Sequence, residues 1–263
     1  MSQWLIASDI DGTLNTKLRR LQPRNQYAIE RFMRCGGHFI LASGRPVASL
    51  ERAYRRVHPN EPCVVLNGAG LYDFERREFI WKQTMEQPAR AFVERMLSTY
   101  GNGLNGVEIG IFGAEQVYLV RAGVLSVGQM VGDKTAYAIK PIDEVPEDDW
   151  FKVVFWGAPN VLSKIKEEAK TEESGSFMAT SPVSFEMLNA GVHKGVAVMK
   201  LAEQIGIEKK RVAAIGDYYN DWDMLKTVGL PACAGQAPQP IREICRYVAC
   251  HCNNGCVADL INR

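Results

Sequence analysis

The sequence predicts an α/β fold in which a parallel sheet forms the core and a separate α+β domain is inserted. Short apolar runs alternate with amphipathic stretches over residues 1–83, and this alternation returns over residues 189–263. Residues 84–188 instead contain paired strand patterns separated by short turns. We therefore expect a Rossmann-like core made of 1–83 and 189–263, with 84–188 as an inserted α+β domain.

The first half of the core is predicted from its apolar runs and its helix boundaries. Pro23 suits the first turn of a helix, and Gly36-Gly37 is typical of a helix end. A strand–helix–strand–helix–strand order predicts parallel strands with helices on both faces of the sheet. The expected strands are 5–8, 38–42 and 63–66, and the expected helices are 23–35 and 47–57.

The inserted domain and the second half of the core are predicted in the same way. Pro88 begins a strongly amphipathic helix, and Gly113-Ala114 separates two runs that indicate a hairpin. In the insert we expect strands at 107–112, 116–121, 136–139, 151–156, 177–180 and 184–188, with helices at 88–100 and 161–169. In the returning core we expect a helix at 194–205, a strand at 211–215 and a helix at 224–228.

Composition excludes several classes of protein. The net charge of +1 gives no electrostatic footprint for nucleic acid or for an anionic membrane. No apolar run approaches the length of a membrane span, and the N-terminal residues do not resemble a signal peptide. The seven cysteines are an odd number without a secretory context, which predicts reduced thiols in a cytoplasmic protein.

Polar side chains follow four of the predicted core strands at the point where each strand ends. Ligands of open parallel sheets bind at these carboxyl ends. Carboxylates there suit a hard cation such as Mg²⁺, while a lysine and backbone N–H groups suit a phosphate. The residues are Asp9, Asp11, Ser43, Gly44, Asn67, Asp217, Asn220 and Asp221, with Lys194 at a helix start.

Four motifs in order resemble those of the haloacid dehalogenase-like (HAD) phosphatase superfamily. They are Asp9-x-Asp11-Gly-Thr, Ser43-Gly-Arg, Lys194-Gly and Gly-Asp217-x-x-Asn220-Asp221. The insert lies between the second and third motifs, as in the Cof-like branch with its large α/β cap domain. The resemblance covers the whole chain. It implies an Mg²⁺-dependent phosphatase acting on a small phosphorylated metabolite, such as a sugar phosphate, with the cap recognising the leaving group.

The resemblance also implies residue roles. Asp9 would be the nucleophile that forms an aspartyl-phosphate, and Asp11 would act as general acid and then as general base. Asp9, the backbone carbonyl of Asp11, and Asp217 would hold Mg²⁺. Ser43, Gly44, Lys194 and Gly12 would bind the phosphoryl group, Asn220 and Asp221 would orient Lys194 and the metal's waters, and Arg45 and Asn67 would meet the leaving group.

Two other functions remain open at this point. A phosphosugar mutase of the same superfamily would use the same Asp pair but return the phosphate to the sugar. A catalytically silent phosphate-binding regulator is disfavoured because Asp9 and Asp11 are both present. Neither the physiological substrate nor the oligomeric state has a recognisable motif.

Three local features depart from simple expectation. Tyr218 follows Asp217 where the family usually has a small residue, so it either narrows the pocket or packs on a neighbouring loop. Gln236 stands where the family often has asparagine. The C-terminal Cys245, Cys250, Cys252 and Cys256 lack the usual paired spacing of a zinc site, so we favour ordinary thiols over bound metal.

Overall fold

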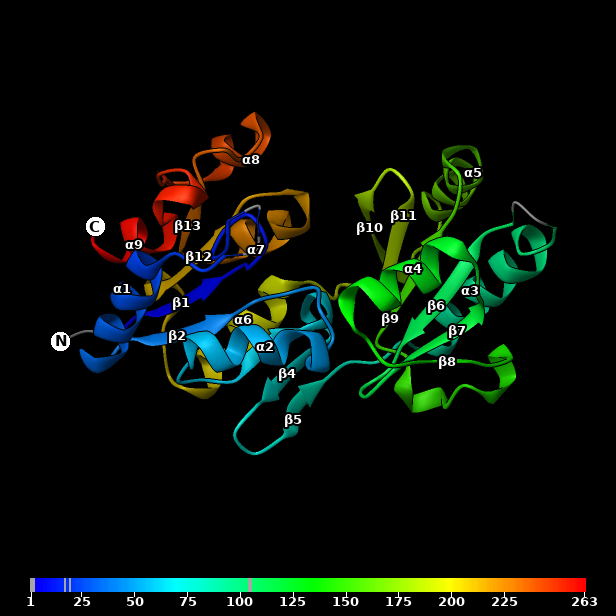
Figure 1. Ribbon diagram of the computed structural model, residues 1–263, viewed down its shortest axis with the longest axis horizontal. Helices are drawn as coiled ribbons and strands as arrows, with labels where there is room; N and C mark the ends of the chain where they lie inside the picture. The colour runs from blue at the N-terminus through cyan, green and yellow to red at the C-terminus, as the bar shows by residue number, and fades with distance from the viewer. Residues whose placement is uncertain (1–2, 17, 19, 104–105) are drawn as a thin grey trace. The chain divides into compact units, whose positions relative to one another are not determined.

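The computed structural model describes residues 3–16, 18, 20–103 and 106–263. The chain divides into two compact units, coloured along the chain in Figure 1. The core unit comprises Met1–Gly44, Leu50–Trp81 and His193–Arg263, and the insert unit comprises Arg45–Ser49 and Lys82–Val192. The longer segment of the insert unit runs from Lys82 to Val192.

A five-stranded parallel sheet forms the centre of the core unit, which confirms the predicted α/β class. Its strand order is β14-β13-β12-β1-β2. Strand β1 pairs with β12 on one side and with β2 on the other, so Ser8 lies beside both Ile215 and Leu41. The strands are β1 (Leu5–Ser8), β2 (His38–Leu41), β12 (Val212–Gly216), β13 (Leu230–Cys233) and β14 (Tyr247–Val248).

Helices pack on this sheet because alternate strand residues point to opposite faces. Leu5 and Ala7 of β1 join an apolar cluster with Val198 and Leu201 of α6. The intervening Ile6 is buried on the other face. The core helices are α1 (Pro23–Arg34), α2 (Val47–Val57), α6 (Lys194–Gln204), α7 (Trp222–Thr227), α8 (Gln239–Ile244) and α9 (Cys256–Ile261), with short 3₁₀ turns η4 (Lys209–Arg211), η5 (Tyr219–Asp221) and η6 (Cys252–Asn254).

The third expected strand is confirmed in part. β3 (Cys63–Val65) runs parallel to the core sheet at a single bridge between Val64 and Ala42. It also pairs antiparallel with β4 (Gly70–Asp73), in a three-stranded sheet that β5 (Glu78–Lys82) completes, and this pairing was not expected. The reason is the backbone of η1 (Leu66–Gly68), where Leu66 and Asn67 have φ angles of 52° and 56° and reverse the chain.

The insert unit is built on a six-stranded sheet with the order β10-β11-β9-β6-β7-β8. The predicted hairpin is confirmed, since β6 and β7 pair antiparallel. Phe92 of α3 and Ile165 of α5 belong to one buried cluster with Val153 of β9, so these helices share a core with the sheet. The strands are β6 (Glu108–Phe112), β7 (Val117–Arg121), β8 (Tyr137–Ile139), β9 (Lys152–Trp156), β10 (Gly175–Ser181) and β11 (Ser184–Asn189), and the helices are α3 (Gln87–Tyr100), α4 (Val124–Asp133), α5 (Pro159–Ala169), η2 (Ile142–Glu144) and η3 (Glu147–Asp149).

Among the described residues, no helix combines the length and the apolar character that a membrane crossing needs.

Candidate active site

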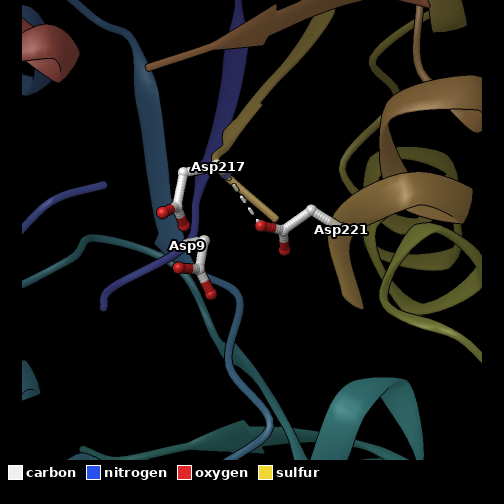
Figure 2. A group of neighbouring side chains, drawn as sticks. All are labelled: Asp9, Asp217 and Asp221. Carbon is white, nitrogen blue, oxygen red and sulfur yellow. Dashed lines mark hydrogen bonds between the residues drawn. The ribbon is translucent and has the colours of Figure 1, made fainter. Parts of the chain in front are cut away.

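Two carboxylates lie at the topological switch point of the core sheet, between β1 and β12. Asp9 follows β1 and Asp217 follows β12, and these two strands are neighbours. The N–H of Asp9 donates to the carbonyl of Ile215 at 2.9 Å, which extends the strand pairing up to the carboxylate itself. Figure 2 shows the side chains of Asp9, Asp217 and Asp221 converging at this edge. Parallel α/β sheets bind ligands at this kind of position.

Lys194 joins two of these carboxylates from the first residue of α6. Its Nζ donates to Asp9 Oδ1 at 2.6 Å and to Asp221 Oδ1 at 2.7 Å. The Lys194 side chain is 1% exposed, and those of Asp9 and Asp221 are 8% and 0% exposed. Ion pairs that are this buried interact strongly because little water screens them.

The start of α6 is held in place by neighbouring residues. His193 caps the helix, since its Nδ1 accepts a hydrogen bond from the N–H of Gly195 at 3.1 Å. Gly68, with a φ of 102°, lies against the backbone of His193, and a Cβ at Gly68 would overlap the His193 carbonyl. These contacts fix where Lys194 enters the site, and histidine is an unusual cap residue that the motif does not reveal.

The loop after β12 adds a second set of links. The N–H of Asp217 donates to Asp221 Oδ2 at 3.1 Å, which is the dashed line in Figure 2. The hydroxyl of Thr13 donates to Asp217 Oδ1 at 3.3 Å. Gly12 has a φ of 84°, and a Cβ there would overlap the carboxylate of Asp217. A glycine is therefore required beside Asp217 both for conformation and for space.

The carboxylates perturb one another. Burial raises the pKa of Asp9 well above its usual range, and the charge of Asp221 raises it further, although Lys194 acts in the opposite direction. Burial and the charge of Asp221 raise the pKa of Asp217 to about 6. Burial alone would lower the pKa of Lys194, but the charges of Asp221 and Asp9 outweigh it and raise that pKa.

Carboxylate oxygens of Asp9, Asp217 and Asp221 lie within 4.8 Å of one another, a spacing that suits a metal ion. Within the described part of the chain, no other group of three or more His, Cys, Asp or Glu has this spacing. Both Asp221 oxygens already accept hydrogen bonds, one from Lys194 and one from the N–H of Asp217. Asp9 and Asp217 are therefore the better candidates for direct coordination.

The structure places Ser43, Gly44 and Asn67 together. Ser43 follows β2, which neighbours β1, and its N–H donates to the carbonyl of Val64 at 3.0 Å. The N–H of Asn67 donates to the carbonyl of Ser43 at 3.0 Å, and the Asn67 side chain lies where a Cβ on Gly44 would stand. Ser43 and Asn67 are both buried. These residues form a polar loop cluster beside the strand that carries Asp9.

Three other predicted site residues, Asp11, Asn220 and Arg45, are not members of the carboxylate cluster. Asp11 is exposed, in a turn that a bridge to Asn15 holds. Asn220 lies within η5 and is half-buried. Arg45 groups with the insert unit, so its contact with a substrate stays a prediction.

Gln236 makes contacts that were not predicted from the sequence. Its Nε2 donates to the carbonyl of Gly12, and its Oε1 accepts from the N–H of Cys252 at 3.0 Å. The side chain thus ties the turn after Asp11 to the C-terminal segment. The unusual glutamine at this position was the only sequence signal.

The C-terminal cysteines and Tyr218 also have definite places. Cys256 donates to the carbonyl of Thr13 at 3.2 Å, and all seven cysteines are free thiols. Tyr218 is 49% exposed, and its ring packs edge-on against Tyr219 with centroids 5.1 Å apart. Neither feature adds a ligand to the carboxylate cluster, since the described cluster consists of Asp9, Asp217 and Asp221 alone.

Comparison with known proteins identifies the family. The family model for haloacid dehalogenase-like hydrolases matches residues 6–261. The chain belongs to this family.

Its relatives carry phosphatase names. A Streptococcus pyogenes protein named "Putative phosphatase" is 26% identical over 276 residues, which cover 100% of this chain and 98% of that protein. A Bacillus subtilis 5-amino-6-(5-phospho-D-ribitylamino)uracil phosphatase is 25% identical, with 92% and 91% of the two chains covered. The solved structure of a HAD subclass IIB sugar phosphatase matches with a TM-score of 0.83 at 17% identity, covering 98% of each chain. Family membership and these relatives support a phosphoric monoester hydrolase.

Proposed function

We propose that this HAD-like hydrolase is an Mg²⁺-dependent phosphatase that cleaves a small sugar phosphate through an aspartyl-phosphate on Asp9. The observation that carries the proposal is the buried carboxylate of Asp9, held by Lys194 at 2.6 Å and grouped with the carboxylate of Asp217. A carboxylate fixed in this way can act as a nucleophile once the charge of the phosphoryl group is neutralised.

The residues present fit Mg²⁺. Mg²⁺ prefers carboxylate and carbonyl oxygens and keeps several waters, and the donors here are oxygens only. Asp9, Asp217 and the backbone carbonyl of Asp11 would hold the ion, while Asp221 is engaged by Lys194. The bound ion would screen the phosphoryl oxygens from the nucleophile and stabilise the charge of the transition state.

The chain's own residues supply the remaining steps. Asp9 Oδ1 accepts the hydrogen bond from Lys194, so we assign Oδ2 as the atom that forms the bond to phosphorus. As the bond from phosphorus to the leaving oxygen breaks, Asp11 donates a proton to that oxygen. Asp11 then accepts a proton from the water that attacks the aspartyl-phosphate, which releases inorganic phosphate and restores Asp9.

The other predicted residues would position the phosphoryl group. Ser43, the Gly44 amide and Lys194 would donate hydrogen bonds to its oxygens. Gly12 would permit the tight turn between Asp11 and this group, because its φ of 84° is open to glycine. Asn220 would orient the metal's waters, and Asp221 fixes Lys194.

The insert unit is proposed as the cap that recognises the leaving alcohol, with Arg45 and Asn67 as contacts. The proposal is supported by a structurally similar protein described as a sugar phosphatase and by a relative named as a 5-amino-6-(5-phospho-D-ribitylamino)uracil phosphatase. A small metabolite of this kind is therefore the proposed substrate class. The cytoplasmic location remains a prediction from the cysteine content.

Phosphate release from a panel of sugar phosphates, with and without Mg²⁺, tests the proposal. We expect release that needs Mg²⁺ and falls by at least about 1,000-fold in Asp9→Asn. Asp223→Asn is a matched control, since Asp223 is exposed on α7, and it should keep its activity. Conversion of a phosphosugar to its isomer without free phosphate would favour the mutase. Phosphate release that survives Asp9→Asn would refute the assigned nucleophile.

A further inference from the structure

A basic cavity lies in the core unit, outside the carboxylate cluster. It has a volume of about 790 Å³ and is bounded by α2, by α1 and by the residues just before α1. Its lining includes Arg20, Arg52, Arg55, Arg56, His58 and Gln26, without any carboxylate among the lining residues. These six lining residues are all exposed, so the cavity is a depression that is open to solvent.

The positive charge of this cavity is only partly balanced. Arg55 pairs with Glu51 of its own helix at 2.7 Å, and both side chains are exposed. Across the described residues, Arg20, Arg52 and Arg56 have no carboxylate oxygen within ion-pair distance. Three guanidinium groups around one concave space repel one another, so an anion bound there would be stabilised by all three.

Helix electrostatics do not explain the arrangement. Basic residues in the last turn of α2 would offset the helix dipole, and Arg55 and Arg56 are placed there. Arg20, however, comes from a different segment, and Arg52 lies a turn earlier. These arginines therefore meet at one cavity because the fold brings the segment before α1 next to α2, and not because of the dipole of α2.

Two backbone features hold the cavity wall in place. The N–H of Arg20 donates to Thr16 Oγ1 at 3.3 Å, and its carbonyl accepts from the N–H of Thr16 at 2.9 Å. His58 has a φ of 48°, a left-handed conformation that costs a non-glycine residue energy, and it turns the chain at the end of α2. Residues kept in such conformations are often found at binding sites.

We propose that this cavity binds a small, multiply phosphorylated anion at a site separate from the catalytic carboxylates. Guanidinium groups match phosphate oxygens through paired hydrogen bonds, and several phosphates can meet several arginines at once. A nucleic acid would need a more extended basic surface than a chain of net charge +1 provides.

Calorimetric titration with inorganic tripolyphosphate in EDTA tests the proposal. Without a divalent ion the carboxylate cluster repels anions, so heat reports other sites. We expect tripolyphosphate to bind at least about tenfold more tightly than inorganic phosphate. The double variant Arg52→Gln/Arg56→Gln should weaken tripolyphosphate binding by about tenfold or more.

The matched control is Arg34→Gln/Arg76→Gln, which removes the same charge from exposed positions outside the cavity and should leave the affinity unchanged. Equal weakening in both double variants would show that only net charge matters and would overturn the proposal. Absence of binding to the unmodified protein at millimolar concentration would also overturn it. Tighter binding of poly-glutamate than of tripolyphosphate, lost in the cavity variant, would reassign the cavity to an acidic protein segment.

Discussion

Replacing Lys194 by methionine should destabilise the core unit strongly. The substitution keeps the length and the apolar stem of the side chain but removes the ammonium that contacts Asp9 at 2.6 Å and Asp221 at 2.7 Å. Both carboxylates are buried and would be left without their cation. Removing one partner of a buried ion pair costs about 3–5 kcal/mol. For a unit of this size, each kcal/mol lowers the Tm by about 2–4 °C, so we expect a fall of about 6–20 °C.

Scanning calorimetry in EDTA is the assay, because a divalent ion would partly replace the missing charge. Lys210→Met is the matched control: Lys210 pairs with Glu208 at 2.6 Å, but the two side chains are 70% and 61% exposed. Water and salt screen that pair, so its loss should shift the Tm by at most about 1 °C.

A double variant separates charge from packing. Adding Asp221→Asn to Lys194→Met removes one of the two orphaned carboxylates and should recover part of the lost Tm. If Lys194→Met shifts the Tm no more than Lys210→Met does, burial has not strengthened the pairing and the reasoning is refuted. If the double variant has a lower Tm than Lys194→Met alone, packing and not charge dominates at this position.

The other predictions concern the turns around the site. Gly12→Ala and Gly36→Ala both place alanine at a φ near 85° and should each cost about 1–2 kcal/mol in thermal unfolding. Gly36 has open space around it, whereas a Cβ at Gly12 would overlap the carboxylate of Asp217. Only Gly12→Ala should therefore also weaken the binding of Mg²⁺, as measured by calorimetry. Equal Mg²⁺ affinity in the two variants would contradict the predicted overlap. Gln236→Leu removes two hydrogen bonds to backbone groups and should lower the free energy of unfolding in urea by about 1–3 kcal/mol. An unchanged midpoint of urea unfolding would show that these two hydrogen bonds do not stabilise the fold. Tyr218→Ala should change the Tm little, since the ring is half-exposed, and a fall like that of Lys194→Met would mean that the ring is structural.

The parallel core could be predicted because its strands are buried on both faces. Such strands appear in a sequence as continuous apolar runs, as in Leu5–Ser8 and Val212–Gly216, and the helices between them have clear boundaries. Pro23, for example, lies at the start of α1 as expected. These local signals agree with the global fold, so the prediction of the class was confirmed.

The antiparallel pairing of β3 with β4 could not be predicted, because an apolar run does not show how many partners a strand has or in which direction they run. The deciding feature is the left-handed backbone at Leu66 and Asn67. Asn67-Gly68 is a dipeptide typical of turns, but the left-handed backbone begins one residue earlier at Leu66, and leucine rarely adopts this conformation. The hairpin of β4 and β5 was missed for a related reason, since its turn contains Arg77 with a φ of 57° in place of a glycine.

The motifs located the charged groups of the site but not the contacts that hold them. Thr13 reaches Asp217 across 204 positions of sequence, and Gln236 reaches Gly12 across 224. No periodicity or spacing encodes such contacts, because they depend on how side chains meet after the strands have paired. His193 was equally hidden, as its role comes from the helix start that it caps.

The charge balance of the site explains why a metal is proposed beside Asp217 and not beside Asp221. Lys194 contacts Asp9 and Asp221 directly, and the second oxygen of Asp221 accepts a hydrogen bond from the N–H of Asp217. Asp217 accepts from the Thr13 hydroxyl, which is a neutral donor. One ammonium therefore faces three carboxylates, and the site is left with an excess of negative charge that Asp217, which has no cationic partner of its own among the described residues, shares with Asp9. Asp9 and Asp217 would hold a divalent cation, which would complete the charge balance and screen the phosphoryl group from the nucleophile.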